Sequence, residues 1–220
     1  MKVPNRSKKK IDAPDSSKPY HHGSVKAKAL KVALELVEAK GIKGLSLREV
    51  AARLKISHVS LYHHFSSKAD LLNSLAAEGF QLFAKIFDEL QAPTETNWKN
   101  QFTRLSFRYI EFAVIHKSHY EVMYSKDRSI SAPSSEVKLH GDRAAKLFLD
   151  FLETGIKLKV LNGDLEFMFV SIWSGLHGAS ELLTANRLQI FIPQYELERF
   201  TNYFSDSLVA KFIVRADRTN

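Results

Sequence analysis

The sequence contains no cysteine. This absence excludes disulfide bonds, zinc sites with cysteine ligands and thiol nucleophiles, and it fits a reducing compartment. Long apolar runs are missing too, because the most hydrophobic stretch, Phe167 to Trp173, is far shorter than the roughly 20 residues of a membrane-spanning helix. Residues 1 to 22 have no apolar segment of the kind found in secretion signals. We therefore expect a soluble, cytoplasmic protein that does not enter a membrane.

Patterns that carry catalysis are also absent. We find no nucleophile elbow, no glycine-rich phosphate loop, no HExxH helix and no carboxylate pair at a distinctive spacing. His58 and His63 are five residues apart, which is a poor spacing for shared metal ligands, and His116 and His119 are typical of polar residues near a helix end. We therefore expect no catalytic residue, no cofactor and no metal.

Positive charge is concentrated in the N-terminal third. Residues 1 to 68 hold 15 Lys or Arg against 5 Asp or Glu, whereas residues 69 to 220 hold 17 against 19. Solubility alone does not require this asymmetry, but neutralisation of nucleic-acid phosphates does. Residues 1 to 22, with Lys8-Lys9-Lys10 and three prolines, are predicted to form a flexible basic arm. Two interpretations of the arm stay open, an inert solubilising tail and a segment that contacts DNA.

From residue 24 onward the apolar residues recur at helical spacing. Leu30, Ala33, Leu34 and Val37 share one face, and Gly41 follows as a C-cap. No alternating run bounded by hairpin turns is present, so the sequence predicts an all-α fold of about nine helices without a sheet. Beyond residue 66 the expected helices are Lys68 to about Leu90, Asn97 to Lys117, Tyr120 to Ser125, Ser135 to Leu161, Asp164 to Ala185 and Pro193 to Val214.

Residues 46 to 68 have the pattern of a helix-turn-helix. Ser46 and Glu49 form a capping box for a first helix that turns Val50, Ala51 and Leu54 inward. A tight turn at Lys55-Ile56 leads to a second short helix, which Ser57 caps and which buries Leu61 and Phe65. This arrangement leaves polar and aromatic side chains facing outward, as expected of a helix that enters the DNA major groove: His58, Ser60, Tyr62, His63 and His64.

Short segments in two regions of the chain resemble a known family. Tyr20-His21-His22-Gly23, Gly41, the segment from Ser46 to Ala51 and the segment from Ser60 to Lys68 closely resemble the N-terminal domain of TetR-family bacterial transcriptional regulators. The segment from Trp173 to Gly178, together with that from His119 to Tyr124, resembles the C-terminal domain of the subgroup named for its Trp, His and Gly.

The resemblance implies a domain organisation and a function. Residues 23 to 68 would form a three-helix DNA-binding domain, and residues 69 to 215 a larger helical regulatory and dimerisation domain. The helix from Lys68 to about Leu90 is expected to be the only continuous element joining them. The protein would be a repressor that binds a palindromic double-stranded DNA operator as a homodimer and responds to an unknown small-molecule effector. The alternative is a helical small-molecule-binding protein or enzyme in which the helix-turn-helix is only structural.

The resemblance also assigns roles to residues of the helix-turn-helix. Arg48 would donate two hydrogen bonds from its guanidinium group to the edge of a guanine, and Val59 would contact a thymine methyl group. His58 and Ser60 would also contact bases. The residues that would hold phosphates are Ser57, Tyr62, His63, His64 and Lys68. His63 stands where relatives often have a bulkier aromatic residue.

Two groups of C-terminal residues have alternative interpretations. Trp173 and His177 are four residues apart, so they share a helix face and either pack in the core or line a ligand pocket. The second group is expected either to pair the last two helices with their copies in a four-helix bundle, as the resemblance implies, or to be buried within one chain. This group consists of Gly175, Ala179, Leu197, Phe200, Phe204 and Leu208.

Overall fold

The computed structural model describes residues 22–125, 132–190 and 196–214, without the side chains of residues 22–24 and 189. The described part of the chain contains nine α-helices, two short 3-10 helices and no strand, and one isolated bridge pairs Leu161 with Ile213. The predicted all-α fold is confirmed. The predicted basic arm and the expected helix start at Pro193 lie outside the described residues.

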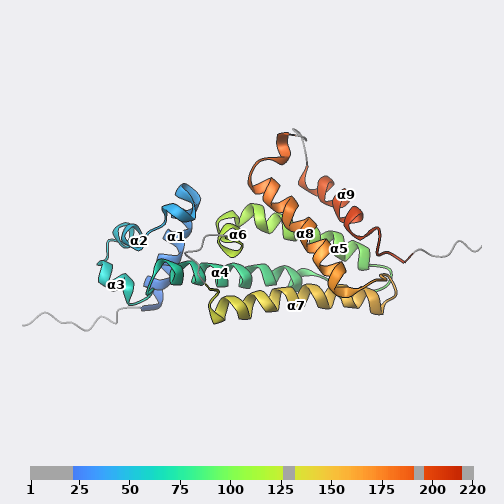
Figure 1. Ribbon diagram of the computed structural model, residues 1–220, viewed down its shortest axis with the longest axis horizontal. Coiled ribbons are helices and arrows are strands. Elements are labelled where there is room, and N and C mark those ends of the chain that lie inside the picture. The colour runs from blue at the N-terminus through green and yellow to red at the C-terminus, as the bar shows by residue number, and fades with distance from the viewer. Residues whose placement is uncertain (1–21, 126–131, 191–195, 215–220) are drawn as a thin grey trace, which may run out of the picture.

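The first three helices form a small unit at one end of an elongated molecule (Figure 1). They are α1 (His22–Gly44), α2 (Leu47–Leu54) and α3 (His58–Tyr62). Leu36, Val50, Leu61 and Phe65 are fully buried between them. Each such side chain contributes about 1.5 to 3 kcal/mol by leaving water. Gly41 interrupts α1 with a φ of 68°, so the predicted stop at this glycine is confirmed, although helical geometry resumes up to Gly44.

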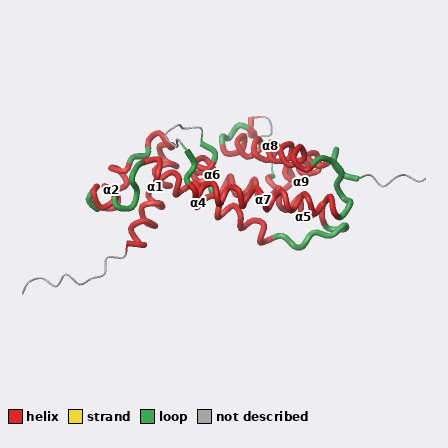
Figure 2. The backbone as a smooth tube through the Cα atoms, turned by 60° about the horizontal axis from the view of Figure 1, so that its bottom comes forward, coloured by secondary structure: helices red, strands yellow, loops and turns green. Residues whose placement is uncertain are grey.

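Six further helices build the larger unit. α4 (Lys68–Ala84), α5 (Trp98–Ile115) and α7 (Ser135–Lys157) run along the long axis, and α8 (Leu165–Thr184) and α9 (Leu197–Val209) pack against α5 (Figures 1 and 2). The short α6 (Lys117–Met123) lies beside α4, at the junction with the first unit. The described residues contain no helix with both the length and the apolar character needed to cross a membrane.

The expected helix ends are wrong at several places, each with a local cause. The helix that begins at Lys68 ends at Ala84, where the Lys85 amide donates to the Leu82 carbonyl and the coil tightens into a 3-10 helix, η1 (Lys85–Glu89). A break at His116, with φ of −104° and ψ of 42°, separates α5 from α6. The left-handed backbone of Lys159, with a φ of 58°, follows the end of α7.

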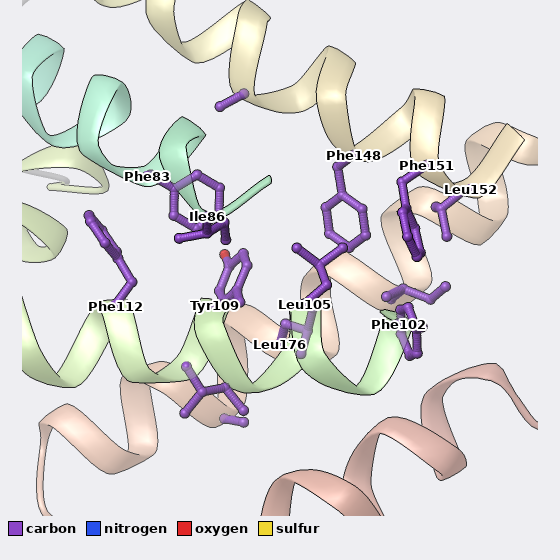
Figure 3. Packing of buried hydrophobic residues seen from close by; sticks show 14 of the residues in the cluster. Phe83, Ile86, Phe102, Leu105, Tyr109, Phe112, Phe148, Phe151, Leu152 and Leu176 are labelled. Atoms are coloured by element: carbon purple, nitrogen blue, oxygen red, sulfur yellow. The ribbon is translucent and has the colours of Figure 1, made fainter. Parts of the chain in front are cut away.

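Aromatic side chains dominate the core of the larger unit (Figure 3). Phe83 of α4 meets Tyr109 and Phe112 of α5 edge to face, with ring centroids 5.0 and 5.3 Å apart. Trp98 is fully buried and stacks on Phe102. The Phe83 ring thus joins the end of α4 to α5. The first half of α4 instead packs in the core of the small unit, through residues such as Leu71 and Leu75.

Candidate DNA-binding surface and ligand cavity

Two serine caps and one left-handed residue set the shape of the helix-turn-helix. The Ser46 Oγ accepts a hydrogen bond of 3.2 Å from the Glu49 amide, and the Ser57 Oγ accepts one of 3.0 Å from the Ser60 amide. Lys55 turns the chain with a φ of 55°. Both predicted helix starts are confirmed. The Glu49 carboxylate does not complete the capping box as expected, because it pairs with the Lys40 ammonium at 2.6 Å.

The side chains predicted to meet DNA are exposed to different degrees. Val59 and Tyr62 are 67% and 46% exposed, and Arg48, Ser57 and His63 are also exposed. Four others are partly buried, so the row predicted to face outward is not uniformly exposed: His58, Ser60, His64 and Lys68. The reason for His58 is an edge-on contact with the Tyr62 ring, at 4.5 Å between centroids.

Lys68 has a second contact that the sequence did not indicate. Its Nζ donates a hydrogen bond of 3.3 Å to the Lys43 carbonyl oxygen near the end of α1. This bond ties the start of α4 to α1. A phosphate contact by Lys68 stays a prediction, and so do the base and phosphate contacts of the other residues.

The helix α6 is a second connection between the two units, so the expectation that only the Lys68 helix joins them is wrong. Val122 of α6 is buried in the core of the small unit, whereas Tyr120 is buried in the larger core. The approach to α4 is close at Gly79, where an added Cβ would lie 2.6 Å from the Met123 Sδ and 3.3 Å from the His119 Cβ. The contact could not be predicted from the sequence, because it joins residues 40 and 44 positions apart.

A histidine is buried in this contact. The His119 Nε2 lies 3.8 Å from the Glu78 Oε2 of α4, a distance too long for a hydrogen bond. Burial lowers the pKa of His119, the Glu78 carboxylate opposes that effect, and His116 adds to it. His119 is thus held neutral at neutral pH.

The larger unit has a partly open cavity of about 270 Å³ between α4, α5, α7 and α8. Trp173 lines it, together with aromatic and small residues, whereas His177 does not. The prediction that Trp173 and His177 share a helix face is confirmed, since their rings stack at 5.6 Å. The full lining is Phe80, Phe83, Tyr109, Tyr124, Gly141, Ala144, Ala145, Phe148, Phe169 and Trp173.

Three tyrosines meet beside this cavity. The Tyr120 hydroxyl and the His177 Nδ1 form a hydrogen bond of 2.6 Å, and the His177 ring packs behind two lining residues, Tyr124 and Trp173. Burial raises the pKa of Tyr109, Tyr120 and Tyr124, so their hydroxyls stay protonated at neutral pH. Sequence reasoning missed Tyr109 and Tyr124 as lining residues, because helical spacing does not distinguish a tyrosine at a cavity from one in a filled core.

The residues predicted for a dimer interface take part in packing within the chain. A Cβ on Gly175 of α8 would lie 2.4 Å from Leu208 and 3.6 Å from Phe204 of α9, and Ala179 is buried. Leu197 and Phe200 are partly buried against the same core. The interpretation as internal burial therefore accounts for these contacts within one chain, and any part of these residues at an interface between copies stays a prediction.

The opposite face of α8 is exposed. Phe167, Val170 and Leu182 are 76%, 52% and 43% exposed, and a Cβ on Gly178 would meet no atom within 4 Å. Tyr203 on α9 is 79% exposed. Within the described ranges, no group of three or more His, Asp or Glu side chains is arranged to hold a metal ion.

The burial of His119 predicts a loss of stability in mild acid. Because the pKa of His119 is lowered in the folded chain, the unfolded chain binds the proton more readily. The contribution of neutral His119 to the free energy of unfolding is fully present above its pKa in the unfolded chain, about 6.5. It is lost as the pH falls through the lower pKa of His119 in the folded chain. Urea unfolding of the wild type and of His119→Gln between about pH 7.5 and 5 should show a smaller loss of unfolding free energy in the variant. The exposed His63→Gln is the control, and equal losses in wild type and His119→Gln would contradict the assignment.

Comparison with known proteins agrees with this geometry. Residues 29–75 match the family described as "Bacterial regulatory proteins, tetR family", and residues 102–202 match "Tetracyclin repressor-like, C-terminal domain". The chain is 27% identical to the HTH-type transcriptional repressor KstR2 of Mycobacterium tuberculosis over 65% of this chain and 72% of that protein. It is 26% identical to YobS, an uncharacterized HTH-type transcriptional regulator of Bacillus subtilis, over 43% of this chain and 48% of that one.

The fold likeness extends further than the sequence likeness. A protein of unknown function from Rhodococcus sp. RHA1 superposes with a TM-score of 0.75 at 23% identity, over 90% of this chain and all of that one. The chain spans about half the length of YobS. None of these matches tests the subgroup suggested by Trp173, His177 and Gly178. The two matched stretches cover about two thirds of the sequence, and the chain belongs to the TetR family of bacterial transcriptional regulators.

Proposed function

We propose that this protein is a ligand-responsive transcriptional repressor that binds a palindromic DNA operator as a homodimer. The proposal rests on the position of α4, a single helix that reaches from the DNA-binding unit to the cavity. An exposed helix-turn-helix lies at one end of α4, and an apolar cavity of about 270 Å³ lies against the other end of the same helix. KstR2 is named a transcriptional repressor, which supports the direction of regulation.

DNA recognition is assigned to the exposed side chains of α2 and α3. Arg48 at the start of α2 would donate two hydrogen bonds to the O6 and N7 of a guanine. Val59, at 67% exposure, would contact a thymine methyl group. The phosphates would be held by the hydroxyls and imidazoles around α3, and the excess of Lys and Arg in residues 1 to 68 supplies the electrostatic attraction.

A homodimer follows from the size of the recognition element. The helix α3 has only five residues, and an element of this size reads a few base pairs. Two copies related by a two-fold axis would double the contact and match a palindrome. The exposed apolar face of α8, with Phe167, Val170 and Leu182, and Tyr203 of α9 supply the surface for pairing. The predicted stripe from Leu197 to Leu208 would then support this surface from within each chain.

Effector control is assigned to α4 and α6 together. Phe80 and Phe83 of α4 line the cavity, and α4 begins six residues after α3 ends. Tyr124, directly after α6, lines the cavity too, while Val122 packs in the core of the DNA-binding unit. A ligand that fits better when α4 and α6 are displaced would therefore change the spacing of the two recognition helices and weaken operator binding.

Substitution of Arg48 is the most direct test of base-specific DNA recognition. We expect Arg48→Ala to weaken a cognate operator, selected from random duplex DNA, by about 1 to 3 kcal/mol more than it weakens scrambled duplex. Arg48→Lys keeps the charge but loses the two-pronged geometry. It should therefore lose selectivity while the slope of log affinity against log salt stays unchanged. Fluorescence anisotropy at several salt concentrations measures both quantities.

Two outcomes of this titration count against the proposal. Equal affinity of the wild type for selected and scrambled duplex would contradict sequence-specific binding and would favour a helical ligand carrier. An Arg48→Ala variant that binds both duplexes more weakly by the same factor would make Arg48 a phosphate contact.

The dimer is tested at the exposed face of α8. Phe167→Glu should leave the folded monomer intact, because Phe167 is 76% exposed, but it would bury an unpaired charge between two copies. We expect the wild type to sediment as a dimer at micromolar concentration and the variant as a monomer with unchanged helical content. Leu139→Glu on α7, at 64% exposure, is the matched control outside this face. A monomeric wild type, or a dimeric Phe167→Glu, would contradict the interface.

A further inference from the structure

One titratable side chain lies inside the contact between α4 and α6. His119 is 7% exposed, and its Cβ lies 3.3 Å from the place where a Cβ on Gly79 would stand. The His119 Nε2 faces the Glu78 Oε2 of α4 at 3.8 Å, and both atoms are closed to solvent. Histidine is the side chain whose ordinary pKa lies nearest to neutral, so a single proton can change the charge inside this contact under mild conditions.

The groups around His119 give little support to a positive charge. From α4 comes the Glu78 carboxylate, whose side chain is 43% exposed to water. From the junction of α5 and α6 comes the His116 ring, with 6.0 Å between the ring centroids, and its charge disfavours a proton on His119. The other charged groups near this end of α1, α5 and α6 are paired elsewhere or exposed: Lys40 with Glu49, Glu111 with Arg108, and Lys43, Lys117 and Glu121.

Burial outweighs the attraction of Glu78. Desolvation is the largest effect on the pKa of His119 and lowers it, whereas the Glu78 carboxylate raises it, and the net shift is downward. A conformation in which α6 has moved away from α4 would return the ring to water and restore its ordinary pKa. Because that conformation binds the proton more tightly, acid shifts the population toward it.

The helix α6 connects this contact to the DNA-binding unit. Val122, three residues after His119 and almost one turn further along α6, is buried in the core of the small unit. Tyr120, the residue after His119, is buried in the larger core. If α6 leaves α4, Val122 stays in its core only if the small unit follows, so the position of the recognition helix depends on the charge of His119.

We propose that protonation of His119 releases α6 from α4 and weakens operator binding, so that mild acid acts as a second signal beside the effector. This assignment deepens the proposed function and rests on it for the operator. The release of α6 itself does not depend on DNA.

The histidines of the recognition segment would act in the opposite direction. A proton on His58, His63 or His64 adds a positive charge beside the DNA phosphates and strengthens binding. The total change of operator affinity with pH therefore combines two effects. The contribution of His119 is obtained from the difference between the wild type and a variant in which only His119 is replaced.

Operator affinity at two pH values measures this difference. The dissociation constant for the selected operator is determined at pH 7.5 and at pH 5.5, and its rise in acid should be at least about fivefold larger for the wild type than for His119→Gln, the lower end of coupling between sites. His140→Gln is the matched control and should behave as the wild type, because that imidazole contacts Gln81 of α4 from α7. Glu78→Gln removes the group that raises the pKa of His119, so it should move the loss of affinity to lower pH.

Hydrogen exchange of residues 117–123 in the full chain without DNA measures the release directly. Between pH 7.5 and 5.5 the wild-type α6 should lose protection relative to α5, which corrects for the change of the intrinsic exchange rate with pH. In His119→Gln, α6 should keep its protection. Circular dichroism at both pH values shows whether the chain stays folded.

Each outcome supports the proposal or overturns it. Equal pH dependence of operator affinity in the wild type and in His119→Gln overturns it, and so does a gain of protection in α6, which would mean that acid closes the pair of His119 and Glu78. A loss of helical content in step with the affinity also overturns it, because that is global unfolding. If α6 loses protection as expected but no operator binds, the acid-driven release stands and the proposed function is wrong. Specific operator binding without a change in α6 has the reverse meaning.

Discussion

The close packing of α4 and α6 at Gly79 holds together the two helices that reach from the larger unit into the small one. Any side chain at residue 79 would overlap the Met123 sulfur and crowd the His119 Cβ, so the absence of one allows α6 to lie directly on α4. From that position α6 buries Val122 among the DNA-binding helices and Tyr120 in the aromatic core. Under the proposed mechanism, a displacement of Tyr124 at the cavity would reach the small unit through α6 and its packed side chains.

The helix boundaries were predictable from the sequence wherever interactions between neighbouring residues determine them. Ser46, Ser57 and Ser67 each accept a hydrogen bond from the amide three residues later, and these short-range bonds fix the starts of α2, α3 and α4. Gly41 stops the regular helix through its own positive φ. The early end of α4 was not predictable, because the apolar spacing continues through Ile86 and Phe87 while the coil tightens from the α to the 3-10 form.

The site was predictable only in part, since it depends on which faces meet in three dimensions. Spacing correctly grouped Trp173 with His177, but it could not show that Trp173 lines the cavity while His177 bonds to Tyr120, 57 residues away. Tyr109 comes from a third helix. Likewise, Gly175 on α8 and Leu208 on α9 were each predicted to lie at an interface between two copies, but they contact each other within one chain. A small residue on one helix and an apolar stripe on another predict close packing, but not whether the two helices belong to the same chain.

The central claim is that the α4–α6 contact sets operator affinity although it touches no DNA. Gly79→Ala tests it directly, because the added methyl group would overlap the Met123 side chain, 2.6 Å from its Sδ, and crowd the His119 Cβ at 3.3 Å, so that side chains of α6 must shift. Gly141→Ala is the matched control on α7, where the added Cβ would make only ordinary contact, at 3.8 Å, with Phe80. The quantity to measure is the dissociation constant for the selected operator, with helical content checked by circular dichroism. The account predicts that Gly79→Ala changes this constant by about 2- to 30-fold, the range for residues along a coupling path, and that Gly141→Ala leaves it unchanged. A folded Gly79→Ala variant with wild-type operator affinity would contradict it.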